Sequence, residues 1–171
     1  PRSDNKAMTH GPCHAAGEPA PRCGIENLKM DFIVGLPNES DDDLVGIADL
    51  LEEAQALMVA HGRDRGRVGT LHAGFNVLVP KPYTPYSREA MLTRKEAQRR
   101  MRLIENRIAG IANIRVNRPG YREAQWQAYL SRGDSSAFTA LEDAADGMSL
   151  GRLLAAHRES VDASTLNPID G

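Results

Sequence analysis

The sequence has 171 residues, which is enough for one domain of ordinary size, and 41% of them are hydrophobic, which is enough for a core. No run of about 18 apolar residues occurs, and the N-terminus lacks the apolar segment of a signal peptide. These features exclude a membrane-spanning helix, and we expect a cytoplasmic protein.

The net charge of −2 is small, but the charges are unevenly distributed along the chain. Residues 30–60 contain eight acidic residues and no Lys or Arg, whereas residues 61–122 contain fourteen Lys or Arg and four acids. Residues 123–171 are acidic again, with eight acids and three basic residues. Solvated helix faces explain most blocks of this kind. The alternative is that residues 61–122 form a basic surface for RNA or another anionic partner.

Residues 1–23 are interrupted by Gly and Pro and show no periodicity, so we expect them to be disordered or irregular. Both cysteines, Cys13 and Cys23, lie here. A disulfide is not expected in a cytoplasmic protein, and the spacing of the two thiols matches no common metal motif. His14 adds only one further candidate ligand, and we expect no metal site.

The stretch from Leu28 to Ser40 is an apolar run, a turn and a helix start. Residues 30–34 are nearly all apolar, which predicts a short strand covered on both faces, as in a parallel sheet. Gly35 allows the backbone to turn or to approach a ligand closely, and Pro37 fixes φ before the next helix. Ligands of α/β folds bind at the carboxyl ends of such strands, so this turn is the first candidate site.

A helix is predicted from Ser40 to His61. Ser40 is a suitable N-cap and Asp43 lies three residues later, as in a capping box. The positions expected to face the core are Leu44, Ile47, Leu51, Ala54 and Met58. Glu39, directly before this helix, is the most suggestive carboxylate in the chain, and the alternative role for it is that of a helix-capping acid.

Residues 70–79 predict a second strand. Asn76 interrupts its apolar pattern, and a polar side chain there must be hydrogen-bonded if buried or can meet a ligand. His72 is interpreted as a core or loop histidine. Lys81 is either an anion-binding residue or a solvated lysine within the Pro-rich segment 80–85, which we expect to be extended.

A third β-α unit and several helices follow. Thr93 and Glu96 form a capping-box pattern, and the helix after them has apolar residues at Ala97, Met101, Ile104, Ile108 and Ile111. A short strand is predicted at 113–118. Helices are then expected at 120–131 (with Tyr121, Ala124, Ala128 and Tyr129 or Leu130 inward), at 136–146 (with Phe138 and Leu141) and at 149–157 (with Leu150, Leu153 and Leu154), before a frayed tail at 159–171.

The order β-α-β-α-β predicts a parallel sheet with crossover helices, and three strands are too few to close a barrel of about eight. We therefore expect an α/β fold: a partial TIM-like barrel at residues 24–118 followed by a helical extension at 119–158. Taken alone, the residues provide no catalytic set, since no nucleophile elbow, phosphate-binding loop or dinucleotide motif occurs.

Three stretches resemble radical S-adenosylmethionine enzymes and together cover roughly residues 25–150. GIENLKMDFIVGLPNES resembles the family's fifth-strand region, an Ile-x-Gly strand running into a Gly-x-Pro-x-Glu-[Ser/Thr] turn, here Ile33, Gly35, Pro37, Glu39 and Ser40. FNVLVPKPYTPYSREAM is similar to the sixth strand and the loop after it. YREAQWQAYLSRGDSSAFTALEDA is similar to the C-terminal helices of uncharacterised members that have an upstream cobalamin-binding domain, which makes cobalamin a candidate cofactor.

The resemblance implies that S-adenosylmethionine binds at the carboxyl ends of the strands. Ile33 would contact the adenine, Gly35 would let the backbone approach it, Val79 would line it from the next strand, and Asn76 would face the barrel interior. In the family, a 4Fe-4S cluster cleaves S-adenosylmethionine reductively to give a substrate radical.

One departure from the family's pattern limits the expected activity. The family's cluster is held by a Cys-x-x-x-Cys-x-x-Cys loop, and this chain has no such loop. The resemblance therefore implies a C-terminal part that is inactive alone and needs the N-terminal half of the same enzyme, with a substrate that the sequence does not identify. The alternative function is a non-catalytic α/β module that binds RNA or another partner through residues 61–122.

Overall fold

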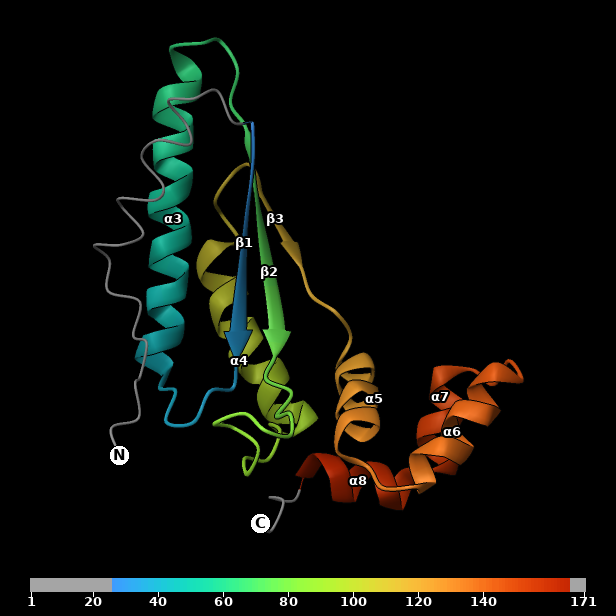
Figure 1. Ribbon diagram of the computed structural model, residues 1–171. Coiled ribbons are helices and arrows are strands. Elements are labelled where there is room, and N and C mark those ends of the chain that lie inside the picture. The colour runs from blue at the N-terminus through green and yellow to red at the C-terminus, as the bar shows by residue number, and fades with distance from the viewer. Residues whose placement is uncertain (1–25, 167–171) are drawn as a thin grey trace. The chain divides into compact units, whose positions relative to one another are not determined.

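The computed structural model describes residues 26–166, which form two compact units (Figure 1). The first, which we call the sheet unit, contains residues 26–32, 42–74 and 103–117. The second, the strand-end unit, contains residues 33–41, 75–102 and 118–166. Two strands and two helices contain residues of both units. The predicted irregular segment 1–23, with both cysteines, lies outside the described residues.

The sheet has three strands in the order β1 (Asn27–Val34), β2 (Thr70–Val77) and β3 (Ile114–Asn117). β2 and β3 are parallel, with Leu71 paired to Ile114 and Gly74 to Asn117, and β1 points in the same direction as β2 (Figure 1). Helix α3 (Asp41–Arg63) connects β1 to β2, and α4 (Arg94–Ile108) connects β2 to β3. This arrangement confirms the predicted α/β fold with parallel strands and crossover helices.

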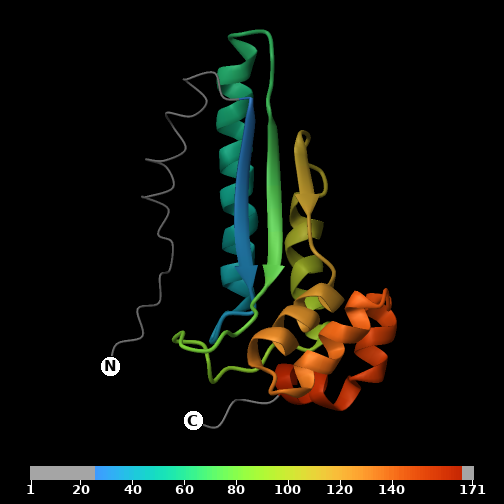
Figure 2. The same ribbon diagram turned by 45° about the vertical axis from the view of Figure 1, so that its right-hand side comes forward.

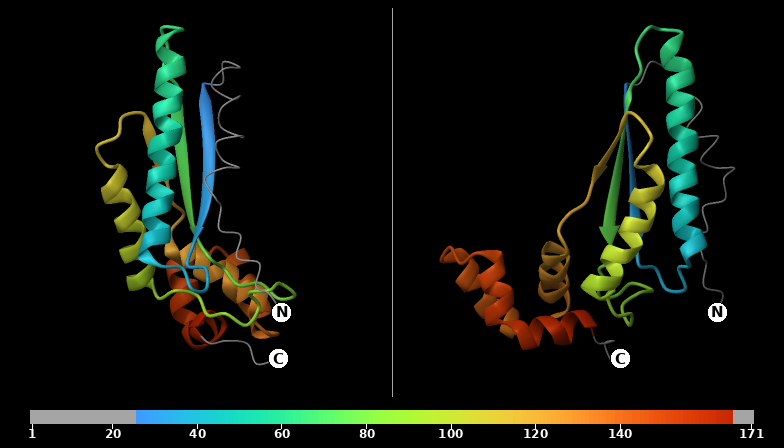
Figure 3. Two further views of the ribbon diagram at one scale, coloured as in Figure 1. Left: turned by 90° about the vertical axis from the view of Figure 1, so that its left-hand side faces the viewer. Right: turned by 180° about the vertical axis from the view of Figure 1, so that it is seen from behind.

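Within the sheet unit, α3 and the C-terminal part of α4 lie on the same face of the sheet (Figures 2 and 3). One stripe of α3 faces inward, with buried residues Leu44, Ala48, Leu51, Met58 and Gly62. The prediction is confirmed for Leu44, Leu51 and Met58, whereas Ile47 and Ala54 are only partly buried. On the strands, Phe32, Leu71 and Ala73 are buried. Because side chains alternate along a strand, these residues share the face that the helices cover.

The opposite face of the sheet is polar. Lys29, Asp31 and Ile33 of β1 are exposed and alternate with buried Phe32 and Val34. The prediction that this strand is covered on both faces is therefore wrong for the described part of the chain. The prediction failed because Ile33 continues the apolar run but occupies an outward position, where it is 51% exposed.

Two neighbouring strands add further polar groups to this open face. His72 pairs with Arg115 across β2 and β3, so both side chains lie on the side opposite Leu71. The Asp31 carboxylate lies over Gly74, where any larger residue would collide with it, and Lys29 forms an ion pair with Asp31 at 2.9 Å.

Four helices form the C-terminal part of the strand-end unit: α5 (Tyr121–Arg132), α6 (Ser136–Ala145), α7 (Leu150–Ala156) and α8 (Arg158–Leu166). Helix α5 packs against α7 and α8. Tyr129, Ala140 and Val161 form the buried core, with Trp126, Ala137 and Leu154 partly buried around it. The sequence indicates that either Tyr129 or Leu130 faces inward. Tyr129 is the buried residue, and Leu130 is exposed.

Two expectations for these helices are wrong. Phe138 and Leu141 are 66% and 47% exposed, because the residue of α6 that contacts the core is Ala140. The expected frayed tail is, as far as residue 166, helix α8 with buried Val161 and Thr165. Sequence periodicity missed α8 because its buried positions are a Val and a Thr, which carry little apolar signal.

The segment after β2 also differs from the prediction. Residues 80–85 are not extended but enter a series of turns that continues to residue 88. The Thr84 hydroxyl donates to the Lys81 carbonyl at 2.8 Å, and the Ser87 amide donates to the Thr84 carbonyl at 3.0 Å. Further on, the Met91 amide donates to the Thr165 carbonyl at 2.8 Å, which joins this segment to α8. No helix in residues 26–166 has the length and apolar character needed to cross a membrane.

Candidate ligand site at the strand ends

The four residues predicted to contact a cofactor all belong to the strand-end unit, where β1 and β2 end together. The Leu78 amide donates to the Val34 carbonyl at 2.8 Å, so the two strand ends are hydrogen-bonded to each other. Ile33 is exposed, while Gly35, Asn76 and Val79 are half-buried. The fold thus brings together, at one edge, residues that are more than 40 positions apart in the sequence.

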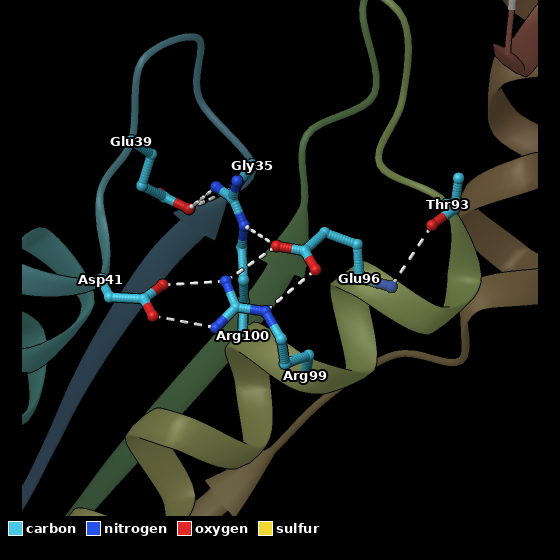
Figure 4. Close-up of polar contacts among 7 residues, drawn as sticks. All are labelled: Gly35, Glu39, Asp41, Thr93, Glu96, Arg99 and Arg100. Atoms are coloured by element: carbon cyan, nitrogen blue, oxygen red, sulfur yellow. Dashed lines mark hydrogen bonds and ion pairs between the residues drawn. The ribbon is translucent and has the colours of Figure 1, made fainter.

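The loop after β1 is closed by Glu39 (Figure 4). Its carboxylate Oε2 accepts a hydrogen bond from the Gly35 amide at 2.9 Å and a second from the Arg100 guanidinium at 2.8 Å. The Glu39 side chain is 5% exposed and that of Arg100 17% exposed, so this ion pair is largely removed from solvent. Glu39 therefore does not cap α3 but fixes the loop that carries Gly35.

Gly35 is required by the shape of this loop. Its φ of +100° lies in the region that residues with a side chain rarely adopt. A Cβ added at Gly35 would lie 2.8 Å from the Leu92 side chain, so the space beside its Cα is occupied by the chain's own Leu92. The φ angle and the nearby Leu92 side chain already explain why a glycine stands here. The close approach of an adenine to Gly35 therefore stays a prediction.

A charged network extends from Arg100 along the first turns of α4 (Figure 4). Glu96 accepts hydrogen bonds from Arg99 and from Arg100 at 2.9 Å, and Arg99 also donates to Asp41 at 2.8 and 3.0 Å. The hydrogen bonds from Arg99 and Arg100 lower the pKa of Glu96 to about 2. The hydrogen bond from Arg99 likewise lowers the pKa of Asp41. These carboxylates are therefore held ionised, which suits positioning and not proton transfer.

The capping-box pattern at the start of α4 is half formed. The Thr93 hydroxyl accepts a hydrogen bond from the Glu96 amide at 3.3 Å, as predicted. The Glu96 carboxylate contacts Arg99 and Arg100 instead of reaching back to Thr93 (Figure 4). The sequence signal located the helix start correctly but did not predict the network, because Glu39 and Arg100 are 61 residues apart.

Of the other polar residues considered, His72 lies half-buried on β2 in the sheet unit, and Lys81 is exposed. Among residues 26–166, no group of three or more His, Cys, Asp or Glu side chains is arranged to hold a metal ion. The described residues therefore do not fit an iron–sulfur cluster, whose ligands are thiolates. For an adenosine group, exposed Ile33 offers apolar surface and half-buried Asn76 offers a polar amide.

Comparison with known proteins yields one distant relative. No protein-family model matches the chain, and no solved structure matches it. Over 117 residues the chain is 24% identical to a Methanocaldococcus jannaschii protein named "Uncharacterized protein MJ0966". The matched region is 68% of this chain and 23% of that protein, so the chain spans less than a quarter of the relative's length.

Proposed function

We propose that this chain is the C-terminal part of a radical S-adenosylmethionine enzyme and supplies the adenine side of the S-adenosylmethionine site. The observation that supports this most directly is the common edge of β1 and β2, joined by the hydrogen bond from Leu78 to Val34. Ile33, Asn76 and Val79 lie at that edge, and ligands of parallel α/β folds bind at the carboxyl ends of the strands.

Each of these residues has a chemical role in the proposal. Ile33 exposes half of its surface at the end of β1, and a planar adenine packed on it would remove that apolar area from water. Asn76 carries both a donor and an acceptor, which is what the edge of a base or a ribose requires. Gly35 and Glu39 act indirectly, because their hydrogen bond holds the loop that follows Ile33.

The cluster that cleaves S-adenosylmethionine reductively in this family would be held outside this chain. Two cysteines cannot supply the three thiolates of the family's loop. The match to a relative of which this chain spans 23% supports a parent protein of greater length. The present chain would therefore bind and orient the nucleoside end of S-adenosylmethionine and would not transfer electrons.

Binding of S-adenosylhomocysteine to the 171-residue chain, measured by isothermal titration calorimetry, tests this proposal without requiring activity. We expect weak but saturable binding, weakened about tenfold or more by Ile33→Glu because a charge replaces the apolar contact. Val116→Glu is the matched control, since Val116 is a β-branched strand residue of similar exposure at 41% and lies on the helix-covered side of β3. Equal affinity for both variants and the unmodified chain would remove the adenine-site assignment.

A second measurement tests the family assignment independently. Anaerobic reconstitution of the chain with iron and sulfide should give no stable 4Fe-4S absorbance, because the thiolates are too few. In the coding region upstream of Pro1 we expect a Cys-x-x-x-Cys-x-x-Cys sequence. A stable cluster in this chain alone, or an upstream region without that motif, would contradict the proposal.

A further inference from the structure

The strand-end unit contains a cavity that is lined by none of the four residues predicted to contact the cofactor. It has a volume of about 490 Å³ and lies between the N-terminal half of α4 and the segment that leads into α5. This volume falls within the range of roughly 300–1,000 Å³ that is usual for small-molecule sites. Its lining contains both charged and apolar residues.

Four arginines line this cavity: Arg94, Arg102, Arg118 and Arg122. The carboxylate among the lining residues is that of Glu123, which is folded back against Gly120. The cations of Arg94, Arg102 and Arg122 repel one another, and an anion bound among them would relieve that repulsion. The composition therefore points to a ligand with more than one negative charge.

The arginines of α4 divide into two groups. Arg99 and Arg100 are paired with Asp41, Glu96 and Glu39, as described above. Arg94 and Arg102, two helical turns apart, line the cavity and form no ion pair with any residue in 26–166. Arg122, on the first turn of α5, also forms none within that range. The guanidinium groups of Arg94, Arg102 and Arg122 thus remain available for a ligand, whereas those of Arg99 and Arg100, nearer the strand ends, do not.

The start of α5, from Gly120 to Arg122, lines the same cavity. No side chain caps this helix, whose N-cap is Gly120. The first amides of a helix have no intrahelical partner and carry the positive end of the helix dipole, which favours anions. Guanidinium forks and helix N-terminal amides together are a usual combination for phosphate.

The cavity also has apolar lining residues, beside the polar Gln98. They are Val77, Ala97, Met101, Pro119 and Tyr121. The Tyr121 hydroxyl donates to the Leu92 carbonyl at 2.6 Å, which fixes the ring in place. These residues suit the non-phosphate part of a small molecule, and a single aromatic residue is fewer than single-stranded nucleic acid uses for base stacking.

We propose that this cavity binds a small phosphate-bearing molecule of the nucleoside diphosphate class. The phosphates contact Arg94, Arg102 and the first turn of α5, and the nucleoside contacts the apolar lining residues. This site is independent of the proposed S-adenosylmethionine site, because no residue is shared between them. It also gives a specific role to part of the basic segment 61–122.

The test is titration calorimetry of the 171-residue chain with ADP, pyrophosphate and adenosine at low salt. We expect ADP to bind tightest, pyrophosphate to bind measurably, and adenosine to bind at least about tenfold more weakly than ADP, because charge-assisted hydrogen bonds supply most of the affinity. The double variant Arg94→Ala/Arg102→Ala should weaken ADP by about tenfold or more. Restoring charge with Arg94→Lys/Arg102→Lys should recover part of that loss.

The matched control is Arg88→Ala/Arg158→Ala, which removes the same charge from two exposed residues of the strand-end unit that lie outside the cavity. It should change the affinity for ADP by less than about twofold, an effect expected from long-range charge alone. Equal losses in the two double variants, or no binding of ADP and pyrophosphate at about 10 mM, would overturn the proposal. RNA binding that ADP does not displace would assign the arginines to a nucleic acid and overturn it as well.

Discussion

Glu39 and Arg100 form an ion pair 2.8 Å long between the loop after β1 and the second turn of α4, and both side chains are largely buried. The same carboxylate oxygen accepts the Gly35 amide. One side chain therefore fixes the loop in which Gly35 has a φ of +100°. The charge of Arg100 is balanced within the strand-end unit, so this pair is structural and contributes to the site only through the position of the loop.

Removing Arg100 should destabilise the protein substantially. Arg100→Leu leaves the Glu39 carboxylate buried without its cation, and we expect a loss of about 2–4 kcal/mol in the free energy of unfolding. Urea unfolding monitored by circular dichroism measures it. Arg107→Leu is the control, because its ion pair with Asp49 is exposed and should be worth less than about 1 kcal/mol. Similar losses for the two variants would show that burial adds nothing to the Glu39–Arg100 pair.

The free energy of unfolding should decrease as the pH is lowered, partly because Glu96 becomes protonated. The pKa of its carboxyl is lowered to about 2 in the folded protein from its usual 4.5, chiefly by the hydrogen bonds from Arg99 and Arg100. A group whose pKa is lowered on folding stabilises the protein above the unfolded pKa, and this contribution is lost as pH falls toward the folded value. The loss should therefore occur between pH 4.5 and about 2.

Glu96→Gln tests this linkage directly. Its destabilisation relative to the unmodified protein should be largest above pH 4.5 and should shrink as pH approaches 2. Urea midpoints measured across that range give the difference. Glu52→Gln, at an exposed position of α3, is the control for the loss of one carboxylate. A constant difference between Glu96→Gln and the unmodified protein would mean that Glu96 does not titrate differently in the two states.

Substitutions at two glycines should have opposite signs. Gly35→Ala places a side chain at φ +100° and against Leu92, and should cost about 1–3 kcal/mol. Gly46→Ala, inside α3 with open space around the new Cβ, should stabilise by about 0.5–1 kcal/mol. Thermal unfolding of both variants measures the difference. The double variant Gly35→Ala/Leu92→Ala separates the collision from the backbone strain, since only the collision is relieved by shortening Leu92.

The sequence predicted the elements whose signal is local. The helix face of Ala97, Met101, Ile104 and Ile108 is buried as its spacing indicates. The start of α4 at Thr93 and the Gly35 turn were also recognised, because capping residues and glycines act within a few positions.

The features that sequence reasoning missed depend on residues far apart in the chain. No local pattern indicates that Glu39 pairs with Arg100, or that Arg94 and Arg122 line one cavity. The predicted burial of Ile33 and Phe138 was wrong for the same reason. Both residues are apolar, but other elements of the fold decide whether they are covered. The sequence shows that residues 61–122 are basic, but only the fold shows which of these arginines line the cavity.

The role of α8 gives the last prediction. Val161 is 2% exposed and belongs to the core with Tyr129 and Ala140, so Val161→Ala should cost about 2 kcal/mol through lost apolar burial and the cavity it leaves. Leu166→Ala, at the 42% exposed end of the same helix, should cost less than about 0.5 kcal/mol. Urea unfolding followed by the fluorescence of Trp126, which packs against this core, reports on both variants. If residues 158–166 were a frayed tail, the two substitutions would be equally harmless, and a Val161→Ala variant as stable as the unmodified chain would remove α8 from the core.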